Sequence, residues 1–149
     1  MSDSLIIIPT FNEKENIEKI IRKVFSLEKL FHILIVDDGS PDGTAAIVKK
    51  LQSQFPNQLH IEEREGKLGL GTAYIHGFKW ALQRDYQFVF EMDADFSHNP
   101  DDLIRLYNAN LLDGGELAIG SRYVKGVNIV NWPMSRLLMS FFASKYVKM

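Results

Sequence analysis

The chain has 149 residues, of which 46% are hydrophobic and 24% are charged, and its formal net charge is −2. These values are typical of one globular domain, and the charge gives no support for general nucleic-acid binding. Cysteine is absent, which excludes disulfides, thiolate metal sites and a cysteine nucleophile. The sequence contains neither a secretory signal peptide nor an apolar stretch of the ~18 residues that span a bilayer. We therefore expect a cytoplasmic protein, with attachment to a membrane surface left open.

Short apolar runs alternate with helical patterns in the first half of the chain. Residues 5–8 and 33–36 are continuous apolar runs rich in β-branched residues, as is typical of buried parallel strands. Between them, apolar residues recur at helical spacing from 17 to 25. A second helix is predicted over about 44–54, after a turn at residues 39–43. Residues 59–63 alternate apolar and polar side chains, which predicts a third, less buried strand.

The same alternation continues in the second half. A glycine-rich segment at 66–72 opens a third helix, and residues 88–92 form a fourth predicted strand. Pro100 begins a helix predicted to reach about residue 110, because proline fits the first turn of a helix. Residues 117–119 are a predicted fifth strand. Strands alternating with helices indicate an α/β fold, with a mostly parallel sheet flanked by helices on both faces.

The end of the sequence has an unusual pattern. Most residues from 133 to 149 are large and apolar, yet a polar residue recurs every four positions (Arg136, Ser140, Ser144 and Lys148). On a helix these residues make one polar stripe. No capping residue or polar tail follows. We expect residues 1–149 to be a single domain that is incomplete at its C-terminus, with an amphipathic helix that packs on a membrane interface or on the rest of the domain.

Two carboxylates follow the fourth predicted strand. Asp93 and Asp95 are two residues apart, so on an extended segment their side chains point the same way. Paired carboxylates suit a hard divalent cation that also binds the phosphates of a nucleotide. Alone, such a pair is also consistent with a solvated turn.

Three more polar clusters lie at the carboxyl ends of predicted strands. They are residues 9–13, 37–40 and 120–123. Ligands of open α/β sheets bind outside the carboxyl ends of the strands. All four clusters therefore predict one site, most simply a site for a nucleotide-linked substrate.

The order of these motifs resembles family 2 of the inverting glycosyltransferases. The matching segments are Pro-Thr-Phe-Asn-Glu, Asp-Asp-Gly-Ser-Pro-Asp-Gly-Thr, Gly-Lys-Leu-Gly-Leu-Gly-Thr-Ala-Tyr, Asp-Ala-Asp-Phe-Ser-His and Gly-Ser-Arg-Tyr-Val. The resemblance covers about residues 4–149 and implies a Rossmann-like GT-A fold that binds a nucleotide sugar. Residues 38–44 and 67–77 are most similar to dolichyl- and polyprenyl-phosphate mannosyltransferases.

The resemblance implies roles for individual residues. The nucleobase would pack against Pro9, Phe11 and Glu13, and either Asp37 or Asp38 would read it. A carboxylate can accept the two N–H donors of guanine or the single N–H donor of uracil, so it does not choose between GDP and UDP. Lys67 belongs to a segment that is either a binding wall or only a flexible loop.

The metal and the acceptor involve the second half of the chain. Asp93 and Asp95 match the site for Mg²⁺ or Mn²⁺ and the diphosphate, and Arg122 and Arg136 match arginines near the leaving diphosphate and the acceptor phosphate. A phosphate monoester is already anionic at pH 7, because its second pKa is ~6, so it needs no general base. If the acceptor were a sugar hydroxyl, Asp95 would be the candidate base. As alternatives, Arg122 pairs with a surface carboxylate and Arg136 keeps the last helix soluble.

The expected function is metal-dependent transfer of mannose from GDP-mannose to a dolichyl-type polyprenyl phosphate, at the cytoplasmic face of a membrane. One alternative is a relative that uses UDP-glucose or another acceptor. Another is a fragment that binds nucleotide sugars without turnover. A nicotinamide dehydrogenase is disfavoured because no Gly-x-Gly-x-x-Gly follows the first strand.

Overall fold

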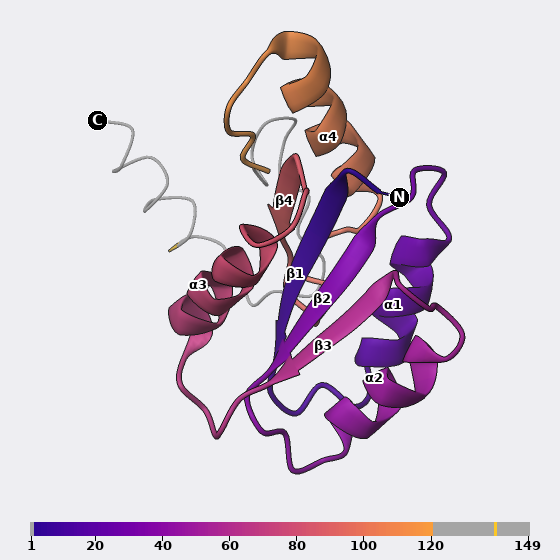
Figure 1. Cartoon of the computed structure of the whole chain (residues 1–149), viewed down its shortest axis with the longest axis vertical. Coiled ribbons are helices and arrows are strands. Elements are labelled where there is room, and N and C mark those ends of the chain that lie inside the picture. The colour runs from indigo at the N-terminus through magenta and orange to yellow at the C-terminus, as the bar shows by residue number, and fades with distance from the viewer. Residues whose placement is uncertain (1, 121–138, 140–149) are drawn as a thin grey trace. The chain divides into compact units, whose positions relative to one another are not determined.

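A computed structural model describes residues 2–120 and residue 139 of the chain (Figure 1). By their contacts, the residues divide into two compact units, Met1–Ala118 and Ile119–Met149. The fold below is that of the first unit. Arg122, Arg136 and the helix predicted over 133–149 lie outside the described residues, apart from Met139.

Four parallel strands form one sheet in the order β3-β2-β1-β4. The strands are β1 (Ser4–Thr10), β2 (His32–Asp37), β3 (Leu59–Glu63) and β4 (Phe88–Glu91). The chain builds outward from β1 to β3 and then returns to place β4 on the other side of β1. The carboxyl ends of β1 and β4 therefore flank a topological switch point, where α/β sheets bind ligands.

Helices cover both faces of this sheet (Figure 1). They are α1 (Ile17–Phe25), α2 (Thr44–Gln52), α3 (Leu70–Ala81) and α4 (Asp102–Asp113). One core joins α1, α2 and α4 to the sheet, and a second core joins α3 to the opposite face. The predicted α/β fold with a parallel, doubly covered sheet is confirmed.

The alternation of side chains in β1 explains its continuous apolar sequence. Ile6 and Ile8 belong to the first core, whereas Leu5 and Ile7 belong to the second, and all four are completely buried. A central strand with helices on both faces needs apolar residues at every position. The apolar residues of β2 alternate between the two cores in the same way.

α3 approaches β1 unusually closely at one glycine. A β-carbon built on Gly77 would lie 2.6 Å from Cγ2 of Ile7. No real side chain is tolerated at that distance, so the absence of a side chain at Gly77 sets the spacing between α3 and the sheet. The same helix begins beside the carboxyl ends of the strands, and its placement therefore also positions the site.

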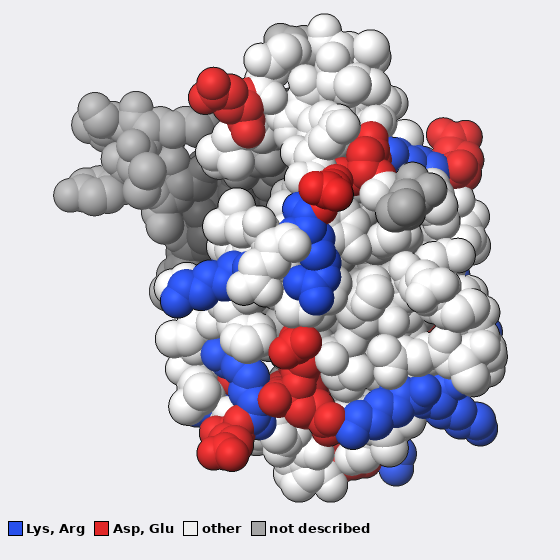
Figure 2. Space-filling model, in the orientation of Figure 1, with Lys and Arg blue, Asp and Glu red and all other residues white. Residues whose placement is uncertain are grey.

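Opposite charges are mixed over the face shown in Figure 2. Ion pairs link segments that are apart in the sequence: Lys29 Nζ lies 2.8 Å from Asp3 Oδ1, and Lys49 Nζ lies 2.5 Å from Glu63 Oε1. An exposed pair such as Lys49 with Glu63 contributes little to stability, so the two cores determine the fold. Among the described residues, no helix combines the length and the apolar character needed to cross a bilayer.

The predicted strand at 117–119 is wrong. These residues have no regular secondary structure, and the side chains of Leu117 and Ile119 are 77% and 79% exposed. Three residues offer few ladder hydrogen bonds, and the preceding Gly114 and Gly115 add conformational entropy that such a short strand must overcome. The other four predicted strands are present with nearly the predicted bounds.

Candidate active site

A pocket of about 270 Å³ opens at the carboxyl ends of β1, β2 and β4, next to the first turn of α3. It therefore lies at the switch point of the sheet. Its lining residues are Pro9, Thr10, Phe11, Glu13, Asp38, Lys67, Gly69, Leu70, Ala73, Asp93, Ala94 and Asp95.

The pocket gathers most of the residues singled out in the sequence. Seven of them line it: Pro9, Phe11, Glu13, Asp38, Lys67, Asp93 and Asp95. Asp37 is not among the lining residues, and Arg122 and Arg136 lie outside the described part of the chain. Segments that are up to 86 residues apart in the sequence, from Pro9 to Asp95, thus meet in one volume.

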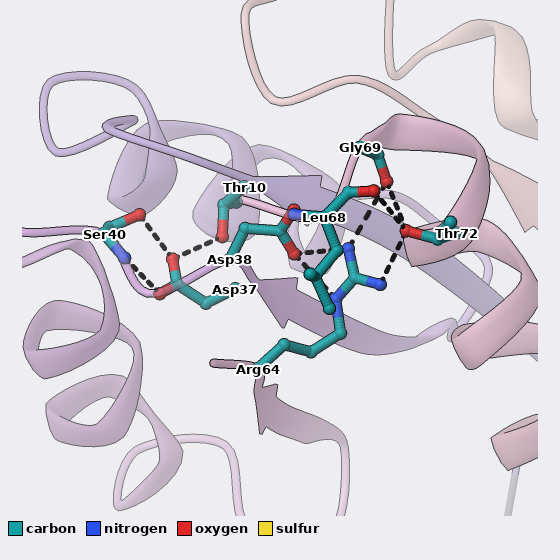
Figure 3. Close-up of polar contacts among 8 residues, drawn as sticks. All are labelled: Thr10, Asp37, Asp38, Ser40, Arg64, Leu68, Gly69 and Thr72. Carbon is teal, nitrogen blue, oxygen red and sulfur yellow. Dashed lines mark hydrogen bonds and ion pairs between the residues drawn. The ribbon is translucent and has the colours of Figure 1, made fainter. Parts of the chain in front are cut away.

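Asp37 is not among the pocket's lining residues, and its side chain ties two strand ends together (Figure 3). Its side chain is only 1% exposed. Oδ1 accepts hydrogen bonds from the hydroxyls of Thr10 (2.8 Å) and Ser40 (2.6 Å), and Oδ2 accepts one from the Ser40 amide (2.9 Å). With these partners, Asp37 organises the loop after β2 from within.

Asp38 lines the pocket and forms a buried ion pair with Arg64. Both side chains are 8% exposed. Nε of Arg64 donates to Oδ1 of Asp38 at 2.7 Å, Nη2 lies 2.5 Å from the same oxygen as the ion pair, and the Leu68 amide donates to Oδ2 at 3.1 Å. Because each carboxylate oxygen accepts about two hydrogen bonds, Oδ2 keeps capacity for one more donor.

The loop after β2 also holds the loop after β1. The Asn12, Glu13 and Lys14 amides donate in turn to the side chains of Ser40, Thr44 and Asp42, at 2.9, 3.0 and 3.0 Å. Burial alone would raise the pKa of Asp42, but hydrogen bonds from Thr44 and Lys14 outweigh it and lower the pKa. These contacts fix the wall formed by Pro9 to Glu13.

An aromatic ring and a cation face each other across this wall. Lys67 Nζ lies 4.6 Å from the centroid of the Phe11 ring. Both residues line the pocket, and a contact of this kind contributes about 0.5–1 kcal/mol at an exposed site. A flat, polarisable ring is also a suitable surface for stacking a nucleobase.

At the other end of the pocket, Tyr74 orients the first carboxylate of the pair. The Tyr74 hydroxyl donates to Asp93 Oδ1 at 3.2 Å. Burial raises the pKa of Tyr74, and the neighbouring charge of Asp93 raises it further. Tyr74 therefore remains a protonated donor at neutral pH. The Asp93 amide donates to Nδ1 of His98 at 3.3 Å.

The second carboxylate is also held by its own loop. The Ser97 amide donates to Asp95 Oδ1 at 2.8 Å. Burial alone would raise the pKa of Asp95, but the hydrogen bonds from Ser97 outweigh it and lower the pKa. Asp95 is accordingly an anion at neutral pH.

Asp93 and Asp95 together fit Mg²⁺ or Mn²⁺ if substrate phosphates and water supply the remaining ligands. Within residues 2–120, no cluster of three or more histidines and carboxylates is placed to hold a metal ion. Mg²⁺ is commonly bound by one or two carboxylates, with substrate phosphates and water as its remaining ligands. Two carboxylates beside an open pocket match that donor set.

Comparison with known proteins assigns the family. The family model described as "Glycosyl transferase family 2" matches residues 5–148. The chain belongs to glycosyl transferase family 2. Its parallel sheet and flanking helices are the Rossmann-like, GT-A-type nucleotide-sugar fold that the sequence resemblance predicted.

Two similar proteins have names that refer to mannose and to a polyprenyl lipid. The polyprenol monophosphomannose synthase of Mycolicibacterium smegmatis is 49% identical over 96% of this chain. The undecaprenyl-phosphate mannosyltransferase of Micrococcus luteus is 43% identical over 95% of this chain. The chain spans only 54% and 57% of these two proteins' lengths.

Solved structures of similar proteins agree with the fold. TarS of S. aureus, residues 1–349, is 26% identical with a TM-score of 0.67, covering 91% of this chain and 39% of that one. The mannosyltransferase PcManGT from Pyrobaculum calidifontis, in complex with GDP-Man and Mn²⁺, is 24% identical with a TM-score of 0.51. That match covers 53% of this chain and 24% of the PcManGT chain.

Several residues around this site were given no role from the sequence. Ser40 belongs to the predicted 37–40 cluster, and Asp42 and Thr44 carry a local signal because Asp-Gly-Thr is typical of a turn before a helix. Their partners 28 to 31 residues away have no local signal. Arg64 is marked only by its place directly after β3, and Tyr74 resembles an ordinary core aromatic.

Proposed function

We propose that this family-2 chain is the donor-binding part of a mannosyltransferase that moves mannose from GDP-mannose to a polyprenyl phosphate. The reaction would use Mg²⁺ or Mn²⁺ and invert the anomeric centre. The printed names of the two relatives at 49% and 43% identity support the sugar and the lipid acceptor.

One observation carries the proposal. A single pocket joins an aromatic and acidic wall, with Phe11 and Asp38, to the carboxylate pair Asp93 and Asp95. A nucleotide sugar needs a flat base-binding surface with a hydrogen-bond acceptor at one end. At the other end it needs a place for its diphosphate and a cation.

The residues divide the work of donor binding. Phe11 would stack on the base, and Oδ2 of Asp38 would accept a base N–H. Asp93 and Asp95 would hold the divalent cation, which when bound neutralises charge on the leaving diphosphate. Tyr74 keeps Asp93 oriented through its hydroxyl.

The acceptor oxygen of a polyprenyl phosphate needs no general base, because it is already anionic at neutral pH. It would form a bond to the anomeric carbon from the face opposite the diphosphate, and GDP would leave with the bonding electron pair. Arg122 and Arg136 are proposed to screen the two phosphates. A lipid acceptor places the reaction at a membrane surface, which we propose to be the cytoplasmic face.

A uridine nucleotide is the alternative that one observation favours. Arg64 Nε donates to Oδ1 of Asp38 and Nη2 also lies against this oxygen, so the position beside the Leu68 amide on Oδ2 is the one left open to a ligand. One position suffices for the single N–H of uracil, whereas guanine must place its second N–H on another acceptor. The family alternatives that use UDP-glucose or another acceptor therefore belong in the same test, as does a fragment that binds but does not turn over.

Calorimetric titration with GDP, GDP-mannose, UDP and UDP-glucose, each with and without Mn²⁺, tests the proposal. We expect Mn²⁺-dependent binding of the two guanine nucleotides. Asp95→Ala should abolish this dependence with the fold retained, whereas Asp85→Ala, at an exposed position outside the pocket, should bind as the unaltered chain does.

Preference for the uridine pair would contradict the mannosyl assignment and favour a glucosyl-type relative. Unchanged GDP affinity of Asp95→Ala in Mn²⁺ would contradict the metal site. Binding without any transfer to polyprenyl phosphate, when a longer form of the protein does transfer, would identify this chain as a binding fragment.

A further inference from the structure

Arg64 joins three segments that are separate in the sequence. It follows β3, and its guanidinium contacts Asp38 after β2, Gly69 before α3 and Thr72 in the first turn of α3 (Figure 3). Nη1 donates to the Thr72 hydroxyl at 2.9 Å, and Nη2 reaches the Gly69 carbonyl at 3.4 Å. Nε donates to Oδ1 of Asp38, and Nη2 also lies against that oxygen in the ion pair.

These contacts close a ring around the glycine-rich wall, residues 66–72. The Thr72 hydroxyl carries one proton to donate, and the carbonyls of Leu68 and Gly69 both lie within hydrogen-bond distance, at 3.0 and 2.8 Å. The Leu68 amide donates a hydrogen bond to Oδ2 of Asp38. Gly66 lies so close to the turn after β2 that a β-carbon on Gly39 would be 3.1 Å from the Gly66 nitrogen. Glycine-rich segments are otherwise the most flexible in a chain, so the wall depends on these contacts for its shape.

The wall contributes Lys67, Gly69 and Leu70 to the pocket, yet Arg64 itself is not among the lining residues. Its side chain is only 8% exposed. Any effect of Arg64 on a ligand must therefore pass through Asp38 or through the wall. Its positive charge also balances Asp38, which would otherwise be a buried, unpaired anion facing an anionic nucleotide.

We propose that Arg64 is a positioning residue for the nucleoside end of the ligand: it orients Asp38 and holds the 66–72 wall against it. This inference rests on the proposed function of the pocket. A lysine keeps the charge but lacks the planar fork, and a single ammonium cannot reach Asp38, Gly69 and Thr72 as the guanidinium does. If only the charge of Arg64 matters, Arg64→Lys should behave as the unaltered chain does. If the shape of the guanidinium matters, Arg64→Lys should loosen the wall and weaken binding.

The test compares Arg64→Lys and Thr72→Val with the unaltered chain, and uses Arg22→Lys as a matched control. Arg22 makes an exposed pair with Glu18 on α1, far from the pocket lining. Amide hydrogen exchange of residues 66–73 in the free protein measures whether the wall is held. Titration of GDP and of inorganic pyrophosphate, both with Mn²⁺, then separates the nucleoside end from the diphosphate end.

For Arg64→Lys we expect exchange in the wall to accelerate about tenfold or more, as the loss of hydrogen bonds to a charged group implies. Exchange in β1 and β2 should stay unchanged. GDP affinity should fall about tenfold, whereas pyrophosphate affinity should be retained. Thr72→Val, which removes one acceptor of the fork, should show smaller changes of the same kind.

Unchanged exchange in both variants would overturn the proposal, and so would equal losses of GDP and pyrophosphate affinity. GDP affinity retained by Arg64→Lys would also overturn it, because charge alone would then suffice. If the unaltered chain binds no nucleotide, the proposed function fails. The exchange comparison still decides whether Arg64 holds the wall.

Discussion

At the scale of single residues, the adjacent aspartates Asp37 and Asp38 have different roles because their side chains point in different directions. Asp37 is buried and accepts three hydrogen bonds from Thr10 and Ser40, whereas Asp38 lines the pocket. Consecutive residues at a strand end point to opposite sides. One carboxylate therefore builds the loop and the other is left for a ligand.

The buried His32 and the partly buried His60 predict a pH dependence of stability. His32 lies against the Tyr86 hydroxyl, at 2.8 Å from Nδ1, and the His60 ring packs 5.0 Å from the Trp80 ring. Burial lowers the pKa of His32 below its usual 6.5; burial, with the charges of His32 and Arg84, lowers that of His60. Below pH 6.5 the unfolded chain binds more protons than the folded chain, so the free energy of unfolding should decrease as the pH falls.

Urea unfolding between pH 8 and pH 5.5 measures this effect. The midpoint should be nearly constant down to about pH 7 and then decrease, and His60→Gln should show a shallower decrease. A midpoint that rises on acidification would contradict the sign of the histidine shifts.

Residue patterns in the sequence predicted the pocket only in part. The rule that strand ends share one edge brought Phe11, Asp38 and Asp95 together correctly, because it depends on topology alone. It could not identify Arg64, whose partner Asp38 lies 26 residues earlier and whose role depends on side-chain direction. Arg122 and Arg136 remain predictions.

At the scale of elements, the close packing of α3 against β1 depends on Gly77. Gly77→Ala would bring a methyl group to within 2.6 Å of Ile7, and we expect this overpacking to destabilise the fold by about 1–3 kcal/mol. Gly71→Ala is the matched control in the same helix, since a β-carbon there meets nothing within 4 Å. It should be neutral or stabilise by up to about 1 kcal/mol.

Urea unfolding of both variants measures the difference between the two glycines. Equal stability of Gly77→Ala and Gly71→Ala would mean that α3 can shift away from the sheet without loss. In that case, the close packing of Gly77 against Ile7 does not position the first turn of α3 at the pocket.

The four predicted strands that are present each pair with a neighbour in the sheet, whether they are buried throughout, as β2 is, or partly exposed, as β3 is. β1 and β2 lie in the middle of the sheet, and their apolar runs admit few other structures. Residues 117–119 are also apolar, but their pattern carries no information on whether a neighbouring strand is there to pair with them. Strand formation needs that partner, which a local pattern does not reveal.

At the scale of the whole molecule, the return of the chain from β3 to β4 creates the site. It sets the carboxyl ends of β1 and β4 side by side and brings α3 in from the other face (Figure 1). The wall formed by Pro9 to Glu13 and the carboxylate pair then line one pocket. The order of motifs in the sequence reflects this path, which is why family 2 was recognisable from the motifs.

The central claim is that this pocket binds a nucleoside diphosphate together with a divalent cation at Asp93 and Asp95. Nuclear magnetic resonance of the ¹⁵N-labelled chain with GDP and substoichiometric Mn²⁺ tests it most directly, because Mn²⁺ broadens the signals of nearby amides. We predict selective loss of the signals of residues 93–97 and of the first turn of α3, with those of α2 and β3 retained. Selective loss centred elsewhere, or the same loss in Asp95→Ala, would contradict the claim.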